Sequence, residues 1–154
     1  MSTNALKAKE IKREWQVFDA KNQTLGRLAV KVANTLMGKG KTNFVNYLDC
    51  GDYVIVTNAS LVKVTGKKET QKKYYRHSGY PGGLKTETLS NLRARRPEEV
   101  IRHAVWGMIP KNRLGRAMMK KIHIYSGTEH PYKNQVSKVT KESKVMEEGA
   151  VLTA

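Results

Sequence analysis

Apolar side chains recur at helical spacing in the segment that follows Thr24. The apolar residues that share one face of this segment are Leu25, Leu28, Ala29, Val32, Leu36 and Met37. Charged side chains, among them Arg27 and Lys31, fall on the opposite face. Thr24 stands where a helix cap is expected, and Gly38 can adopt the left-handed conformation that commonly ends a helix. The pattern predicts an amphipathic helix over residues 25–37.

Short apolar runs lie on both sides of this helix and again further along the chain. Trp15, Val17 and Phe18 form a short apolar run before the helix, and residues 53–56 form an apolar, β-branched run after it. Runs of this length are typical of strands, and the second is suited to a buried one. A strand, a helix and a second strand form a βαβ unit, so we expect a parallel sheet. Residues 122–125 predict a final strand.

The middle of the chain predicts further helices and one more strand. The expected elements are a helical turn near Leu61, a strand over residues 74–77, a short helix over 86–92, a helix that begins at Pro97 and is ended by Gly107 and Pro110, and a basic helix over 113–121. Within the strand, Tyr74 and Arg76 share one face, and Tyr75 and His77 share the other. One tyrosine therefore belongs to the core, and the alternation alone does not say which.

The order of these elements predicts an α/β layer fold with helices covering the sheet. A chain of 154 residues is long enough for a single domain with a hydrophobic core of its own. The composition changes near both ends, where the sequence becomes polar and mixed in charge. We expect an N-terminal arm over residues 1–14, an α/β core over residues 15–131 and a C-terminal tail over residues 132–154.

The charge balance indicates a polyanionic partner. The chain has 29 lysines and arginines against 13 aspartates and glutamates, a formal net charge of +16. An excess of this size repels itself in a compact chain and is usually retained for a polyanion. No apolar run approaches the ~18 residues of a membrane-spanning helix, so nucleic acid is a better partner than a membrane. The single Cys50 and the polar start of the sequence favour a reducing, cytoplasmic location.

The cations concentrate in three zones. Residues 63–85 hold seven lysines and arginines against one glutamate, and residues 93–96 hold three arginines. Residues 111–121 hold five cations and no carboxylate, and the apolar side chains between them anchor this zone to a folded body. Aromatic and basic residues cluster together in residues 72–77. That combination suits RNA, because rings stack on bases while cations hold phosphates.

The sequence contains no convincing catalytic, metal or cofactor motif. Residues 39–42 resemble the end of a P-loop, but Thr35 stands where that loop requires glycine, and the stretch follows a helix instead of preceding one. The four histidines lack metal-ligand spacing. Asp49 and Asp52 flank a turn at Cys50, where aspartate normally stabilises the turn and no base marks the cysteine as a nucleophile. We expect neither an enzyme nor a metal or cofactor site.

Eight short stretches are specific enough to compare with a known family. They are WQVFDA (residues 15–20), TLGRLA (24–29), DCGDYVIV (49–56), VTGKK (64–68), ARRPE (94–98), GMIP (107–110), LGRAM (114–118) and IHIYSG (122–127). Together and in this order they closely resemble the signature of the bacterial L-thirteen family of large-subunit ribosomal proteins. Trp106 is a departure, since the family more often has lysine or arginine there, and a tryptophan could stack instead. The tail after His130 is also longer and more basic than the family pattern.

The resemblance implies a three-layer α/β/α domain with a mostly parallel four-stranded sheet. It implies binding to large-subunit (23S-type) rRNA, neighbouring large-subunit ribosomal proteins as partners, and an early role in subunit assembly. It also implies no catalytic activity, and we do not expect homo-oligomers. Two alternatives remain open. One is a messenger-RNA-binding translational repressor that uses the same surface, and the other is a Rossmann-like enzyme, which would need a cofactor loop that the sequence lacks.

On this hypothesis, basic loops on one side of the core contact phosphates and 2′-hydroxyls and recognise RNA largely by its shape. The three glycines in the set below would let the backbone approach RNA closely. The residues predicted to bind RNA are Lys39, Lys41, Lys67, Lys68, Lys72, Lys73, Arg76, His77, Gly79, Gly82, Gly83, Arg93, Arg95, Arg96, Lys111, Arg113, Arg116, Lys120 and Lys121.

Overall fold

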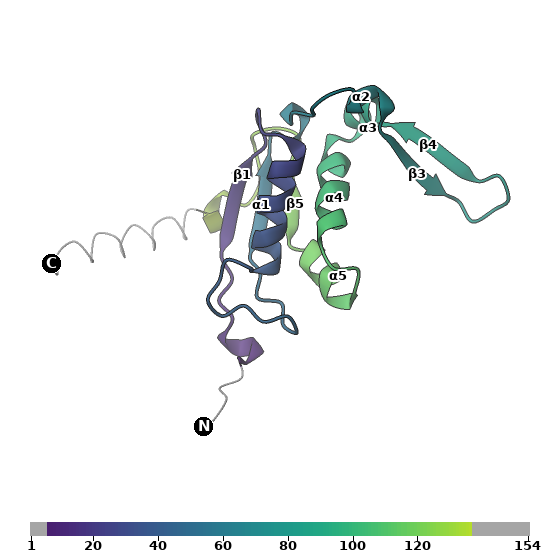
Figure 1. The fold of residues 1–154 in the computed structure, drawn as a ribbon. Coiled ribbons are helices and arrows are strands. Elements are labelled where there is room, and N and C mark those ends of the chain that lie inside the picture. Colours follow the sequence, from purple (N-terminus) through teal and green to yellow (C-terminus); the bar gives the residue numbers. More distant parts are fainter. Residues whose placement is uncertain (1–5, 137–154) are drawn as a thin grey trace.

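The computed structural model describes residues 6–136, which fold as a mixed α/β domain (Figure 1). Its main sheet is parallel, and the strands follow the order β1 (Trp15–Asp19), β2 (Tyr53–Thr57) and β5 (Ile122–Ile124). Trp15 lies opposite Tyr53, and Val54 lies opposite Ile122. The predicted βαβ unit and parallel sheet are confirmed. The four strands implied by the resemblance are wrong, because this sheet has three strands within the described residues.

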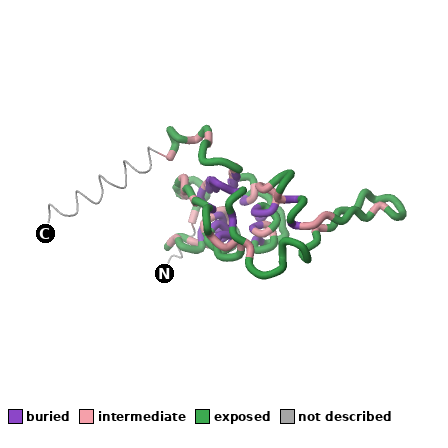
Figure 2. The backbone as a smooth tube through the Cα atoms, turned by 90° about the horizontal axis from the view of Figure 1, so that it is seen from above, coloured by how far each residue is buried: buried purple, intermediate pink, exposed green. Residues whose placement is uncertain are grey.

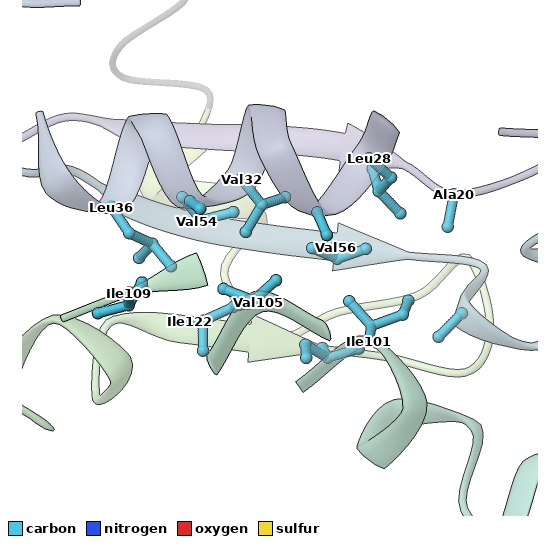
Figure 3. Close-up of a cluster of buried hydrophobic side chains, with 14 of the residues drawn as sticks. Ala20, Leu28, Val32, Leu36, Val54, Val56, Ile101, Val105, Ile109 and Ile122 are labelled. Carbon is cyan, nitrogen blue, oxygen red and sulfur yellow. The ribbon is translucent and has the colours of Figure 1, made fainter. Parts of the chain in front are cut away.

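Helices α1 (Leu25–Met37) and α4 (Pro97–Met108) lie side by side on one face of this sheet (Figure 1). Their apolar faces and every second residue of β2 and β5 meet in the main core (Figure 3). Core residues from these four elements include Leu28, Val32, Leu36, Val54, Val56, Ile101, Val105 and Ile122. Burial of such side chains stabilises the fold by roughly 1.5–3 kcal/mol each. The resemblance implied helices on both faces, but these two helices share one face because both apolar stripes pack into this core.

Stacked aromatic rings cover the opposite face of the parallel sheet. Trp15 and Tyr53, neighbours on β1 and β2, stack with ring centroids 4.5 Å apart. The Tyr132 ring lies 4.8 Å from Trp15 and 4.6 Å from His123 of β5. The predicted boundary between core and tail therefore falls inside a packed cluster, and residues 133–136 continue from it as helix. Contacts of this kind add roughly 0.5–1.5 kcal/mol per aromatic pair beyond the area buried.

We expect this aromatic cluster to make stability depend on pH through His123. Burial, and to a smaller extent the charge of Arg102, lower the pKa of His123 below its ordinary value of about 6.5. The unfolded chain therefore binds a proton here at a higher pH than the folded chain, so the free energy of unfolding falls as the pH falls through about 6.5. Urea unfolding above and below that pH measures the loss. His123→Phe keeps a ring but cannot titrate, so an equally large loss in this variant would contradict the prediction.

A second sheet stands apart from the parallel one. Strands β3 (Lys73–His77) and β4 (Leu84–Thr88) pair antiparallel and project from the body as a hairpin (Figure 1). The predicted strand over residues 74–77 is confirmed, but it belongs to this hairpin and not to the main sheet. Most of the hairpin is exposed to solvent (Figure 2).

The short helix predicted over residues 86–92 begins later than expected. Residues up to Thr88 belong to β4, and helix α3 (Leu89–Arg95) starts immediately after them. The Thr88 hydroxyl accepts a hydrogen bond from the Asn91 backbone N–H at 3.4 Å, so it caps the helix. A β-branched residue that also caps a helix fits the junction between the two elements.

The two tyrosines of β3 have different environments. Tyr74 is half-buried and packs against a small second core formed by Leu89, Leu92 and Val100. Burial raises the pKa of Tyr74. The side chain of Tyr75 is 65% exposed. The core tyrosine that the alternation left open is therefore Tyr74.

The basic helix predicted over residues 113–121 is α5 (Arg113–Met119), which ends two residues early and leads into β5. Helix α4 runs through Gly107 to Met108, so Gly107 does not end it. Two short 3₁₀ turns, η1 (Ala8–Glu10) and η2 (Ala59–Leu61), and a four-residue helix α2 (Lys68–Gln71) complete the described elements. The helical turn expected near Leu61 is η2, whereas α2 was not predicted.

Candidate nucleic-acid interface

The hairpin carries an unusual concentration of positive charge. Arg76 on β3 lies directly opposite Lys85 on β4. Like charges at opposed positions of an antiparallel pair destabilise it. An anion placed between the two side chains would remove this repulsion. Lys85 lies outside the predicted set, because its position opposite Arg76 depends on a strand that the sequence did not reveal.

The predicted glycines shape the loop that joins the two strands. Gly79 and Gly82 have φ angles of +95° and +71°, which favour glycine. A Cβ at Gly83 would overlap the Ser78 hydroxyl. His77 accepts a hydrogen bond through Nδ1 from the Gly79 N–H at 3.0 Å. The hairpin loop itself requires these glycines, so a contact with RNA is not needed to explain them.

The segment around α2 borders a cavity of about 460 Å³ between α1 and α4. Lys63, Lys68, Lys72 and His103 line it together with the first turn of α1. That turn has no acidic residue, and Thr24 occupies the cap position without a side-chain hydrogen bond. The positive end of the α1 dipole therefore borders the same cavity as the ammonium groups of Lys63, Lys68 and Lys72. Lys67 and Lys73 lie beside this region and are exposed.

Helix α5 and the turn before it form a further exposed basic surface. Lys111 donates a hydrogen bond to the Trp106 carbonyl, and its ammonium lies 4.1 Å from the Trp106 ring centroid. The tryptophan that departs from the family pattern therefore fixes a neighbouring cation. Arg113 and Arg116 are exposed, and no acidic side chain among residues 6–136 pairs with them.

Lys121 is one predicted RNA-binding residue whose charge is used inside the protein. Its residue surface is 6% exposed, and its ammonium donates to Asp49 Oδ1 at 2.6 Å and to the Gly51 carbonyl at 2.8 Å. Burial lowers the pKa of Lys121, while the Asp49 carboxylate acts in the opposite direction. A phosphate cannot replace these partners without opening the core. Lys121 therefore has a structural role inside the protein, and its contact with RNA stays a prediction.

Arg93 and Lys41 are also occupied internally. Arg93 donates to the carbonyls of Ser60 and Val62 and pairs with Glu69, which ties α3 to the chain after β2. Lys41 pairs with Asp52 at 2.5 Å and donates to a backbone carbonyl of the N-terminal arm at 2.8 Å. The strongest partners of both side chains therefore lie in the protein, and their contacts with RNA stay predictions.

The remaining predicted cations lie at the surface. Arg95 pairs with Glu87 at 2.7 Å, but its side chain stays 62% exposed. Lys39, Arg96 and Lys120 are exposed as well.

Asp49 also accepts a hydrogen bond from the Gly51 N–H at 3.4 Å, which agrees with its predicted role in the turn.

Comparison with known proteins identifies the family. Residues 13–131 match the family model described as Ribosomal protein L13. The chain belongs to the ribosomal protein L13 family. A large ribosomal subunit protein uL13 of Roseiflexus sp. (strain RS-1) is 54% identical over 139 residues, which cover 90% of this chain and 95% of that protein. The uL13 of Alcanivorax borkumensis is 52% identical over 135 residues, 88% of this chain and 95% of that protein.

Membership of the L13 family confirms the resemblance seen in the sequence. The chain is a structural constituent of the large ribosomal subunit and is not an enzyme. Among residues 6–136 no group of three or more acidic, histidine or cysteine side chains could hold a metal ion. Over the same range no helix is long and apolar enough to cross a membrane.

Proposed function

We propose that this L13 family member binds large-subunit rRNA through the exposed cations of the hairpin, the α2 segment and α5, and that it helps early subunit assembly beside neighbouring ribosomal proteins. The observation that carries the proposal is the opposed pair Arg76 and Lys85 on a projecting hairpin. No carboxylate among residues 6–136 forms an ion pair with either cation, and a polyanionic partner explains two cations held face to face in this way.

The contact set follows from exposure and from the partners of each side chain. It excludes Lys41, Arg93 and Lys121, whose charges are paired within the protein, and the three predicted glycines Gly79, Gly82 and Gly83, which the hairpin loop itself requires. It adds Lys63 and Lys85. The proposed contacts are Lys39, Lys63, Lys67, Lys68, Lys72, Lys73, Arg76, His77, Lys85, Arg95, Arg96, Lys111, Arg113, Arg116 and Lys120.

The fold supports a role in organising RNA. The main core is closed by side chains of the protein alone, so the domain can fold before RNA binds. The basic zones lie on different elements, and contacts to phosphates and 2′-hydroxyls from such zones fix the relative positions of separate RNA segments. Recognition of this kind depends on shape more than on base sequence. A protein that folds first and then fixes RNA geometry is suited to early assembly.

We expect Arg113→Glu combined with Arg116→Glu to weaken binding to large-subunit rRNA by more than tenfold without unfolding the domain. Both side chains are exposed, so their replacement leaves the core intact. If about eight cations meet phosphates, the wild-type slope of log affinity against log salt is roughly −7, and each lost contact makes it shallower by about one. RNA binding measured across a range of salt concentrations gives both quantities.

The lysine variants Arg113→Lys and Arg116→Lys preserve the charge and serve as the matched control. Crosslinking in cells complements the binding assay, because the wild-type protein should recover mainly large-subunit rRNA and the glutamate variant much less. A wild-type slope shallower than about −2 would argue against a polyanion interface. Recovery of mainly messenger RNA would replace the proposed function with translational repression.

A further inference from the structure

The hairpin exposes aromatic and apolar side chains beyond its cations. Tyr75 is 65% exposed, Tyr80 in the connecting loop 77% and Leu84 58%. These residues belong to β3, β4 and the loop between them, which project from the body as a hairpin (Figure 1, Figure 2). The rings of Tyr75 and Tyr80 do not enter the second core as Tyr74 does, and a two-stranded hairpin is only marginally stable by itself. A partner that covers these rings would explain both features.

We propose that the hairpin is a stacking platform for unpaired RNA bases, with Tyr75 and Tyr80 as the stacking residues. The inference rests on the proposed function, because it assumes an RNA partner. It goes beyond that function by adding contacts to bases. Phosphate contacts alone position a protein on RNA, whereas stacking selects segments whose bases are free.

The strand register places the required groups on one face. Lys73, Tyr75 and His77 follow one another on the same side of β3. Leu84 lies opposite His77 and completes this face from β4. A base stacked on the Tyr75 ring would have a cation within its own face of the hairpin to hold the adjoining phosphate. Tyr80 extends the row of rings into the loop.

The charge of the hairpin identifies the occupant as nucleic acid and not as another protein. Residues 72–88 carry four lysines and arginines and one acid, Glu87. Glu87 is already paired with Arg95 at 2.7 Å. A protein docking on exposed tyrosines would have to bring a strongly acidic surface. Unpaired RNA brings both the aromatic bases and the negative charge in one molecule.

Stacking and phosphate contacts can be separated by their salt dependence. Tyr75→Ala combined with Tyr80→Ala should weaken binding to single-stranded oligouridylate by roughly tenfold per tyrosine and leave the salt slope unchanged. Tyr75→Phe with Tyr80→Phe should bind like the wild type, because stacking needs the ring and not the hydroxyl. Lys73→Gln should instead make the slope shallower by about one, because Lys73 lies on the same face of the hairpin as Tyr75. Tyr47→Ala removes a tyrosine that is 64% exposed away from the hairpin and is the matched control.

A perfectly paired RNA duplex of equal length is the second probe, and the alanine variants should bind it as the wild type does. Equal losses on duplex and single strand, an equal loss with Tyr47→Ala, or no loss at all would overturn the stacking proposal. Tyr80→Ala alone decides the outcome if the double variant does not fold, because Tyr80 lies outside the strand ladder. Stacking on oligouridylate without preference for large-subunit rRNA would sustain this inference and reject the proposed function. Salt-dependent rRNA binding that is insensitive to both tyrosines would do the reverse.

Discussion

Lys121→Met is expected to lower the free energy of unfolding by about 3 kcal/mol, because it leaves a largely buried carboxylate without its partner. Asp49 is 15% exposed at its side chain and its Oδ1 lies 2.6 Å from the Lys121 ammonium. The same ammonium also satisfies the Gly51 carbonyl at 2.8 Å. Lys121→Met therefore removes the ammonium donor from Asp49 Oδ1 and from the Gly51 carbonyl, in a region that is largely shielded from water.

The neighbouring residue provides the control for this experiment. Lys120 is exposed, so Lys120→Met should change the free energy of unfolding by no more than about 0.5 kcal/mol. Asp49→Asn added to Lys121→Met removes the unpaired charge and should recover part of the loss. Urea unfolding of the three variants gives the values. An undisturbed fold with weakened rRNA binding for Lys121→Met would show that Lys121 belongs to the RNA surface after all.

Nothing in the local sequence distinguishes Lys120 from Lys121. Both follow the basic helix α5 and precede β5, and both belong to the same basic zone. The difference arises from Asp49, which is 72 residues away and reaches Lys121 because β2 and β5 are neighbours in the sheet. Strand and helix patterns report local burial, so they predicted the βαβ unit correctly. Partners across a parallel sheet follow from register, which the patterns do not contain.

The strand β4 of the hairpin was not predicted from the sequence. Residues 84–88 contain one apolar side chain, that of Leu84, so they lack the alternation of apolar and polar residues that signals a half-buried strand. Without β4, neither the pairing of Arg76 with Lys85 nor the exposed face around Tyr75 could be deduced. The total charge and its clustering indicated a polyanion. Which cations are free to meet it depends on internal partners such as Glu69 for Arg93.

Gly115→Ala is expected to destabilise the domain by about 3 kcal/mol, because the added methyl group has no space. A Cβ at Gly115 would overlap the Pro110 carbonyl oxygen and lie 3.1 Å from Ile109 Cγ2, an atom of the main core. The Gly115 N–H donates to Asn112 Oδ1 at 2.7 Å, which fixes the first turn of α5 in this position. Relief of the overlap requires that turn to shift as a backbone unit.

Gly107→Ala is the matched control and should act in the opposite direction. Gly107 lies in the last turn of α4, and no atom stands within 4 Å of the position its Cβ would take. Alanine there should stabilise the helix by roughly 0.5–1 kcal/mol, since glycine loses more backbone entropy on folding. Thermal or urea unfolding of the two variants tests the pair. Because α5 carries Arg113 and Arg116, a shift of its first turn should also make Gly115→Ala bind rRNA more weakly than Gly107→Ala. Equal free energies of unfolding for the two variants would contradict the tight packing of α5, on which both expectations rest.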